Sequence, residues 1–394
     1  MADRRFVLSK GPHLRKADFP KVYGTGTIMK DLFIALLPLV LFGFLKNGLF
    51  PFIHGDTNSV YEMLRPLIMV IVGTGTSYLI EVAYFALFFK EKEPFRRSFN
   101  SYSVIPGLLI SMIAPLYTPL WVLMIGVIFG EIIGKMLFGG FGYNIFNPAL
   151  IGYVFIATAF YGVISKNGGY LNPTEIAAMA NLNPGVSVDA LTAATPLATF
   201  KDVLSGAKSL DELFSTNGSL LQCFLGNTSG SMCETSAMLC LVSYVYLVVC
   251  GVIDWKTPLV FIGSVFVFSY IVGAFIGYAG TLKFALFNVL SGGVVFGGVF
   301  MVTEPVTSPR DPLGKLFYAI FIALVAMMVR YLTGFNEGVA TAILFMNMFT
   351  PILDIKCAQL RVQEDKKKMV LGYSIFAIIA IAIIVYTVLS VTIK

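Results

Sequence analysis

Residues 257–279 read T-P-L-V-F-I-G-S-V-F-V-F-S-Y-I-V-G-A-F-I-G-Y-A, a run of 23 residues without a charged side chain. An α-helix rises about 1.5 Å per residue, so this run is long enough to cross the hydrocarbon core of a bilayer, which is about 30 Å thick. Further apolar runs recur from Leu32 to Ser390. The sequence therefore predicts an all-α protein that crosses a membrane many times.

The composition of the 394-residue chain supports the same prediction. Hydrophobic residues make up 57% of it and charged residues 13%, and its mean hydropathy is +0.82. A soluble domain has about 25% charged residues, so these values exclude a soluble enzyme. The net charge is +6, and we expect the basic residues behind it to reflect the orientation of the chain in the membrane. We expect lipid around the chain and no nucleic acid as a partner.

Eleven apolar segments are candidate spans, which predicts about 10 to 11 transmembrane helices. Their approximate limits are residues 32–50, 66–89, 102–114, 119–138, 148–164, 236–252, 257–279, 284–302, 314–333, 338–353 and 370–391. The segment 102–114 has only 13 residues before Pro115, too few for a straight crossing. The first 30 residues hold seven Lys and Arg and no secretory signal pattern, so we expect a retained N-terminal arm.

The distribution of basic residues predicts the orientation, because Lys and Arg are enriched in cytoplasmic loops. With the N-terminus inside, 20 of the 28 Lys and Arg fall on the inner side and eight on the outer side. We therefore expect a multi-pass protein of the cell membrane (inner or plasma membrane) with a cytoplasmic N-terminus. The expected divisions are a cytoplasmic arm at 1–31, a first membrane half at 32–164, an extracytoplasmic loop at 165–235, a second membrane half at 236–353, a cytoplasmic basic loop at 354–369 and an extra C-terminal helix at 370–394.

Interruptions at matching places in the two halves indicate an inverted repeat. The short segment 102–114 lies in the first half, and the segment 284–302, interrupted by Gly292-Gly293 and Gly297-Gly298, lies in the second. Broken helices at corresponding positions are typical of inverted-repeat membrane proteins with a site near the midplane. The alternative is that these glycines only let helices pack closely.

The cysteines and histidines do not form a metal-binding pattern. The five cysteines contain no C-x-x-C pair, and His13 and His54 are far apart in the sequence. A zinc site or an iron–sulfur cluster built by this chain alone is therefore not expected. Cys223 and Cys233 fall in the outer loop, where an oxidising compartment would allow a disulfide, but we favour single buried thiols.

Two acidic residues lie within apolar segments and are candidates for an ion path. A charge at the centre of a membrane helix costs about 2.5 to 3.5 kcal/mol on insertion scales, so it rarely persists without a use. Glu131 has Lys135 one turn away, and there we favour an ion pair near the cytoplasmic interface with Lys135 reaching towards water. Glu81 has no partner nearby in the sequence, and for it we favour a cation or proton path.

Two polar motifs are expected next to the cytoplasmic side of the membrane. G-G-F-G-Y-N-I-F-N-P-A-L, residues 139–150, places Asn147 as an N-cap before Pro148 at a helix start. Backbone amides at such a start could bind an anion or the edge of a flavin ring, although capping alone explains most of the motif. T-E-P-V-T-S-P-R, residues 303–310, is either an ordinary turn or part of a pocket.

A motif in the outer loop carries a family resemblance. D-A-L-T-A-A-T-P-L, residues 189–197, resembles the flavin-attachment motif D-x-x-[S/T]-G-A-T of the D subunit of the Rnf complex and of its relative, the B subunit of the sodium-pumping NADH:quinone oxidoreductase. The matching residues are Asp189, Thr192, Ala194 and Thr195. Ala193 stands where glycine is usual. The stretches 134–150 and 300–309 also resemble this family, and the likeness covers roughly residues 10–357.

The resemblance implies a fold, cofactors and partners. Family members form an inverted-repeat helix bundle related to urea and ammonium channels, usually of ten helices. They hold FMN by a phosphoester to a threonine hydroxyl, which implies covalent FMN on Thr195, attached outside the cytoplasm by a flavin transferase that uses FAD and Mg²⁺. Relatives also hold a non-covalent riboflavin, whose contacts the resemblance does not assign, although residues 303–309 are a candidate inner pocket. Asn147, Thr303 and Pro305 are the further candidate cofactor-binding residues. The implied partners are the other subunits of the Rnf complex.

The favoured function is therefore a membrane electron-transfer subunit of a ferredoxin:NAD⁺ oxidoreductase that couples electron flow to Na⁺ or H⁺ movement and is not active alone. The short N-terminal arm favours the Rnf D subunit over the B subunit of the quinone reductase. A stand-alone channel or transporter and a scaffold without a cofactor are the alternatives from other classes. Covalently bound flavin distinguishes the first hypothesis from these two.

Overall fold

The computed structural model describes residues 24–182, 219–277, 280–333, 338–362 and 366–392, and every regular element within them is a helix. Within these ranges, six helical stretches are long and apolar enough to cross a membrane. They are α1 (Thr25–Phe44) with its continuation through a π-helical turn into α2 (Phe50–His54), α3 (Val60–Leu87), α6 (Leu120–Gly134) with a 3₁₀ turn that extends it to Phe138, α14 (Lys256–Ile276), α17 (Pro312–Leu332) and α20 (Lys366–Thr392).

Two bent helix pairs could each form one more crossing. The first joins α15 (Thr281–Leu290) to α16 (Val294–Phe296) and a π-helical segment that ends at Met301, with a bend of 60°. The second joins α18 (Gly338–Asn347) to α19 (Thr350–Val362), with a bend of 64°. The shorter helices are α4 (Pro94–Asn100), α5 (Val104–Ile113), α7 (Pro148–Ala159), α8 (Tyr161–Lys166), α9 (Pro173–Leu182), α12 (Leu220–Leu225) and α13 (Ala237–Val249).

Each of the eleven apolar segments contains a helix, which confirms the all-helical, multi-span prediction. Length supports six to eight crossings rather than 10 to 11, because α5, α7 and α13 have only 10, 12 and 13 residues. The segment 354–369, expected as a basic loop, lies partly in helices, since α19 extends to Val362 and α20 begins at Lys366.

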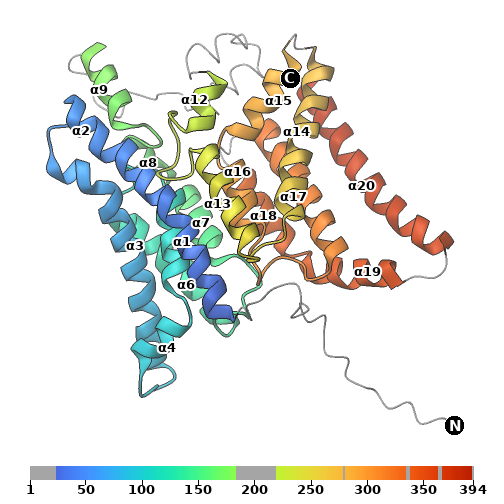
Figure 1. Cartoon of the computed structure of the whole chain (residues 1–394), viewed down its shortest axis with the longest axis horizontal. Coiled ribbons are helices and arrows are strands. Elements are labelled where there is room, and N and C mark those ends of the chain that lie inside the picture. Colours follow the sequence, from blue (N-terminus) through green and yellow to red (C-terminus); the bar gives the residue numbers. More distant parts are fainter. Residues whose placement is uncertain (1–23, 183–218, 278–279, 334–337, 363–365, 393–394) are drawn as a thin grey trace.

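The helices form two groups that lie side by side (Figure 1). In the first group α3 packs on α5 and α6, and α6 packs on α7. In the second group α14 packs on α15 and α17, and α17 packs on α18, while α1 packs across the boundary on α13. Figure 1 places α2, α9 and α12 at one end of the bundle and α4 and α19 at the other. Segments that the charge pattern assigns to one side of the membrane therefore share an end of the molecule.

Short helices end inside the bundle, where arginines bind carbonyl groups that no helical partner reaches. Arg330, which is 1% exposed, donates to the carbonyl of Asn288 in the last turn of α15 at 2.7 Å. It also donates to the carbonyls of Ser291 and Gly292, just past the end of α15, at 3.2 and 3.1 Å. In the other group Arg65 donates to the carbonyl of Leu116, three residues past the end of α5, at 2.9 Å. A buried or half-buried guanidinium thus stabilises each break.

Part of the outer loop returns into the bundle at the end of α5. The amide of Cys233 donates to the carbonyl of Met112 at 3.0 Å, and that of Met232 donates to Ala114 at 3.2 Å. Both side chains are buried. The last residues of the segment 165–235, expected outside the membrane domain, are therefore packed within it.

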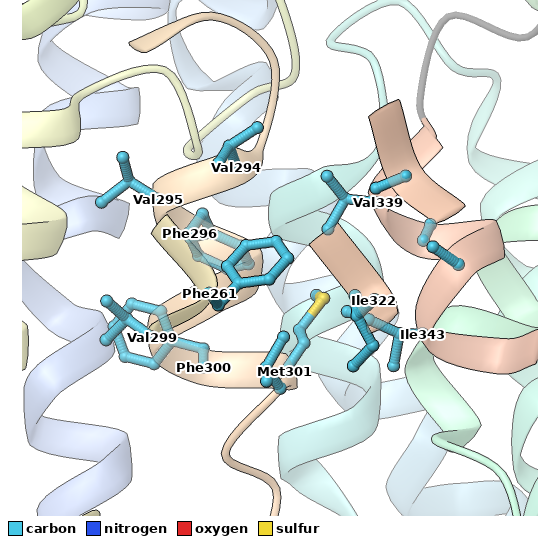
Figure 2. Close-up of a cluster of buried hydrophobic side chains, with 14 of the residues drawn as sticks. Phe261, Val294, Val295, Phe296, Val299, Phe300, Met301, Ile322, Val339 and Ile343 are labelled. Atoms are coloured by element: carbon cyan, nitrogen blue, oxygen red, sulfur yellow. The ribbon is translucent and has the colours of Figure 1, made fainter. Parts of the chain in front are cut away.

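The first of the two bends is surrounded by an apolar core. Figure 2 shows Phe261 of α14 against Phe296, with Val339 and Ile343 of α18 on the other side of the broken helix. A Cβ atom added at Gly297 would lie 2.7 Å from Val339 Cγ1, and one added at Gly298 would lie 2.7 Å from Phe261 Cδ1. These two glycines therefore permit close packing of the π-helical segment against both neighbours, as the alternative interpretation of this pair expected.

The contact between α3 and α5 also depends on glycine. A Cβ atom at Gly73 would lie 1.9 Å from Ser111 Oγ and 2.9 Å from the carbonyl oxygen of Gly107. The hydroxyl can rotate away, but the backbone carbonyl cannot. Gly75, two residues further along α3, faces open space.

Gly73→Ala is expected to separate α3 from α5 and to destabilise the protein by about 1 to 3 kcal/mol, the usual cost of overpacking. Gly75→Ala is the matched control and should leave stability unchanged or raise it slightly, because alanine is the better helix former. Thermal unfolding of the detergent-purified variants measures both. Equal melting temperatures for the two variants would show that the close contact is unimportant.

Candidate functional site

A cavity lies beside the start of α1. Figure 1 shows the start of α1 towards the same end of the bundle as α4. The empty space between the walls of the cavity, open mouth included, is about 760 Å³. Five separate segments line it, namely the start of α1, the turn and helix from Tyr102 to Leu109, the stretch from Lys135 to Ala149, residues 252–253 and residues 300–306. The cavity therefore exists only when both halves of the protein are assembled.

The walls of the cavity are largely apolar and aromatic. The rings of Tyr102 and Phe141 meet edge to face, with centroids 5.5 Å apart, and Phe300 and Ile105 contribute further apolar surface. Tyr102 has a φ of 53°, a backbone conformation that residues other than glycine rarely adopt. Its turn is thus held in an unusual geometry that points the ring towards Phe141.

The polar groups of the cavity come from the two inner motifs. Asn147 accepts hydrogen bonds from the amides of Ala149 and Leu150 at 3.0 and 3.2 Å, so it caps α7 as the sequence predicts. Asn144 donates to the carbonyl of Phe146 at 3.1 Å. These bonds fix both asparagines in the wall of the cavity.

Glu304 adds a carboxyl group to the same wall. Thr307 Oγ1 donates to its Oε2 at 2.8 Å. Burial raises the pKa of Glu304 to about 7, and the hydrogen bonds from Thr307 and Asn144 oppose that rise. Near neutral pH this carboxyl can therefore act either as a donor or as an acceptor towards a ligand.

A second cavity adjoins the first and shares Val252, Ile253, Thr303 and Pro305 with it. It encloses about 630 Å³, mouth included, and is more polar. Thr257 in its lining has a buried hydroxyl without a hydrogen-bond partner among the described residues. Asp254, Arg310 and Lys315 supply charges. A ligand that fills both cavities would have an apolar and a polar part.

The structure brings together three of the residues proposed from sequence as cofactor contacts. Asn147, Thr303 and Pro305 all line the first cavity. Thr195 and the other matching residues of its motif, Asp189, Thr192 and Ala194, lie outside the described residues. The cavity adds Tyr102, Asn144 and Glu304 to the candidate contacts. The last two stand within the two polar motifs, whereas nothing in the sequence marks Tyr102.

A buried charge cluster lies beside the first cavity. Lys135 Nζ is 3.1 Å from Glu81 Oε2 and 3.4 Å from Glu131 Oε2, and all three side chains are at most 2% exposed. Lys135 also donates to the carbonyl of Ser101 at 3.4 Å. Since Lys135 also lines the cavity, the charge cluster adjoins it.

These distances correct one sequence expectation, for Lys135, and add a partner to Glu81. Glu81 has no partner nearby in the sequence, but it pairs with Lys135 of the segment after α6, a residue 54 positions away that sequence proximity could not reveal. The Glu131–Lys135 pair is confirmed, but Lys135 does not reach towards water and is 2% exposed. Glu81 also lies nearer the end of its helix than its middle, about two turns from Leu87.

No group of three or more His, Cys, Asp or Glu side chains suitable for a metal ion occurs among the described residues. All five cysteines, which the structure describes, are free thiols, and four of them, including Cys223 and Cys233, are buried. The interpretation as single buried thiols is therefore confirmed over a disulfide.

Comparison with known proteins identifies the family. Residues 7–363 match the family described as NQR2, RnfD, RnfE. The chain is 31% identical over 351 residues to the D subunit of the proton-translocating ferredoxin:NAD⁺ oxidoreductase complex of Clostridium ljungdahlii, which covers 89% of this chain and 93% of that protein. It is 28% identical over 357 residues to the D subunit of the Na⁺-translocating complex of Acetobacterium woodii, covering 90% and 94%.

The chain is also similar to a subunit of a different complex, an NADH-quinone reductase. The B subunit of the Na⁺-translocating NADH-quinone reductase of Pseudomonas aeruginosa is 30% identical over 263 residues, which covers 66% of this chain and 60% of that protein. The likeness to these two D subunits is thus the more extensive one. Helix α20 lies beyond the matched residues. The chain is a multi-pass membrane protein that belongs to the NQR2, RnfD, RnfE family of subunits of ion-translocating redox complexes.

Proposed function

We propose that this chain is the D-type electron-transfer subunit of an ion-translocating ferredoxin:NAD⁺ oxidoreductase in the cell membrane. The observation that carries the proposal is the cavity beside Lys135, because it combines aromatic walls with asparagine and carboxyl groups in a member of this family. The near full-length likeness to D subunits favours this complex over the quinone reductase. A channel or a scaffold would have no use for such a lining.

The cavity suits a non-covalent flavin such as riboflavin. A flavin, when bound, accepts and donates electrons through a flat ring system that is apolar except at one edge. Tyr102, Phe141 and Phe300 would cover the faces of the ring, while the Nδ2 amide of Asn147 and the carboxyl of Glu304, held by Asn144, would bind its polar edge. The hydroxyl of Thr257 in the adjoining cavity is a donor suited to a ribityl chain.

A second flavin, FMN, is proposed on Thr195 through a phosphoester. The support is the motif at residues 189–197 and the family to which the chain belongs. A flavin transferase that uses FAD and Mg²⁺ would be a transient partner, and the other subunits of the complex would be permanent ones. A covalent tether suits an electron carrier because the group is never released.

The two halves are proposed to form an inverted repeat related to urea and ammonium channels, with residues 165–235 outside the cytoplasm. The corresponding pairs α3–α5 and α14–α15, followed by α6–α7 and α17–α18, support this arrangement. The arginine-bound breaks after α5 and α15 support it as well. The charge distribution supports the orientation.

Ile105→Trp should fill the cavity and release the non-covalent flavin while leaving covalent flavin in place. Ile125→Trp is the control, because Ile125 is exposed on the surface of α6. The measurement is the amount of flavin extracted per chain after denaturation, compared with the fluorescence of the denatured band. A loss of at least tenfold in extractable flavin, specific to Ile105→Trp, is expected, and unchanged extractable flavin would place that cofactor elsewhere.

Thr195→Val should abolish covalent flavin, because valine keeps the shape of threonine and lacks the hydroxyl. Thr192→Val is the matched control and should retain some attachment, since Thr192 is expected to serve only recognition. Both variants are produced with the transferase and examined for a fluorescent band after denaturation in SDS and acid. A fluorescent band for Thr195→Val would refute the assignment.

A further inference from the structure

The hydroxyl of Ser77 makes two contacts inside the charge cluster but has only one hydrogen atom. Ser77 Oγ donates to the carbonyl oxygen of Ser103, and it lies 2.6 Å from Glu131 Oε1. A carbonyl oxygen can only accept, and the contact with Ser103 is the shorter of the two, so we place the hydrogen of Ser77 there. The contact with Glu131 then needs a hydrogen from the carboxyl group. This geometry assigns a proton to Glu131 Oε1.

Charge balance gives the same result. With both carboxyl groups ionised, the cluster would carry a net charge of −1 although all three side chains are buried. Uncompensated charge in a low-dielectric interior is costly. With Glu131 protonated, the remaining charges are Lys135 and Glu81, which form the shorter pair at 3.1 Å. Glu131 Oε2 is then a carbonyl oxygen that faces the ammonium group.

The surroundings of Glu131 favour a proton over a metal cation. The charged groups facing it are Glu81 on α3 and Lys135 at the end of its own helix, and α5 and α7, which also pack near α6, contain no acidic or basic residue. Hard metal cations are held by about six oxygen ligands. Here the position between the two carboxyl groups is taken by the ammonium group of Lys135.

We propose that Glu131 holds one exchangeable proton and that the ion handled by this cluster is H⁺ rather than Na⁺. Release converts the carboxylic acid to a carboxylate and a proton, and the charge of the cluster changes from neutral to −1. The role of this proton in ion translocation rests on the proposed function, whereas its presence on Glu131 rests only on the geometry and charge of the cluster.

The cluster is placed to communicate with the cavity through a single turn. Ser101 accepts from Lys135 and Ser103 accepts from Ser77, while Tyr102, between them, lines the cavity. Lys135 itself lines the cavity as well. Loss of the proton would therefore add a negative charge next to the proposed flavin, and a change in the charge of the ligand would act back on Glu131.

Infrared spectroscopy of the full chain tests the proton directly. The protein is purified without flavin in a maltoside detergent, which has no carbonyl group of its own. The spectrum of the wild type minus that of Glu131→Gln should contain the C=O stretch of one neutral carboxylic acid, shifted in D₂O. No such band in the difference spectrum would overturn the proposal.

Three further variants locate the proton. Ser77→Ala should shift the frequency of the band, because it removes the hydrogen bond at Oε1. Ser111→Ala should not shift it, because the hydroxyl of this buried serine contacts only the backbone carbonyls of Met69 and Gly107, which share its single hydrogen. Lys135→Met should add a second band, since neither carboxyl then has a counter-ion. A band insensitive to Ser77→Ala would place the proton on Glu81 and overturn the assignment.

Sodium provides the last comparison. Addition of NaCl in place of choline chloride at constant pH should leave the band unchanged, because the cluster has no place for the cation. Loss of the band with Na⁺ would identify a sodium site and contradict the proposal. The protein contains no flavin in these experiments. A result that refutes the proton on Glu131 would therefore leave the proposed flavin sites untouched, and the reverse also holds.

Discussion

The ammonium group of Lys135 is the interaction on which the inner part of this protein depends. It is buried, and it binds Glu81 of α3, Glu131 of α6 and the carbonyl of Ser101 in the turn before α5. Removal of one partner of a buried ion pair leaves an uncompensated charge, which costs about 3 to 5 kcal/mol. The ammonium group therefore fixes α3, α6 and the 101–103 turn relative to one another. The 101–103 turn also places Tyr102 in the wall of the cavity.

A second constraint is that every backbone polar group within a membrane needs a partner inside the protein. Helices that end within the bundle violate this rule unless other groups supply the hydrogen bonds. Arg330 supplies them after α15, and the amides of Met232 and Cys233 supply them at the end of α5. The broken helices can therefore exist only because segments distant in the sequence return to meet them.

Sequence reasoning succeeded where the cause is local. Apolar runs predicted the helices, Asn147 before Pro148 predicted the cap of α7, and the four-residue spacing predicted the Glu131–Lys135 pair. The glycines at 292–293 predicted the break after α15. Each of these features depends on residues within about one turn of each other, so the sequence shows them directly.

Features that depend on tertiary contacts were not predictable in this way. The Glu81–Lys135 pair joins residues 54 positions apart, and the cavity takes its walls from five segments. Helix α19 was missed because its apolar run is interrupted by charged residues such as Asp354 and Lys356, a pattern that a search for spans interprets as a loop. The number of crossings was overestimated because short helices inside the bundle have the same composition as spanning ones.

We propose that an inner flavin and the buried charge cluster both adjoin Lys135. The most direct measurement is an experimental density map of the purified complex with its flavins bound. We expect ring density in the cavity between Tyr102 and Phe300, with Asn147 and Glu304 at its polar edge and Lys135 still paired with Glu81. A lipid tail in that cavity with the flavin elsewhere, or Lys135 turned away from Glu81, would contradict it.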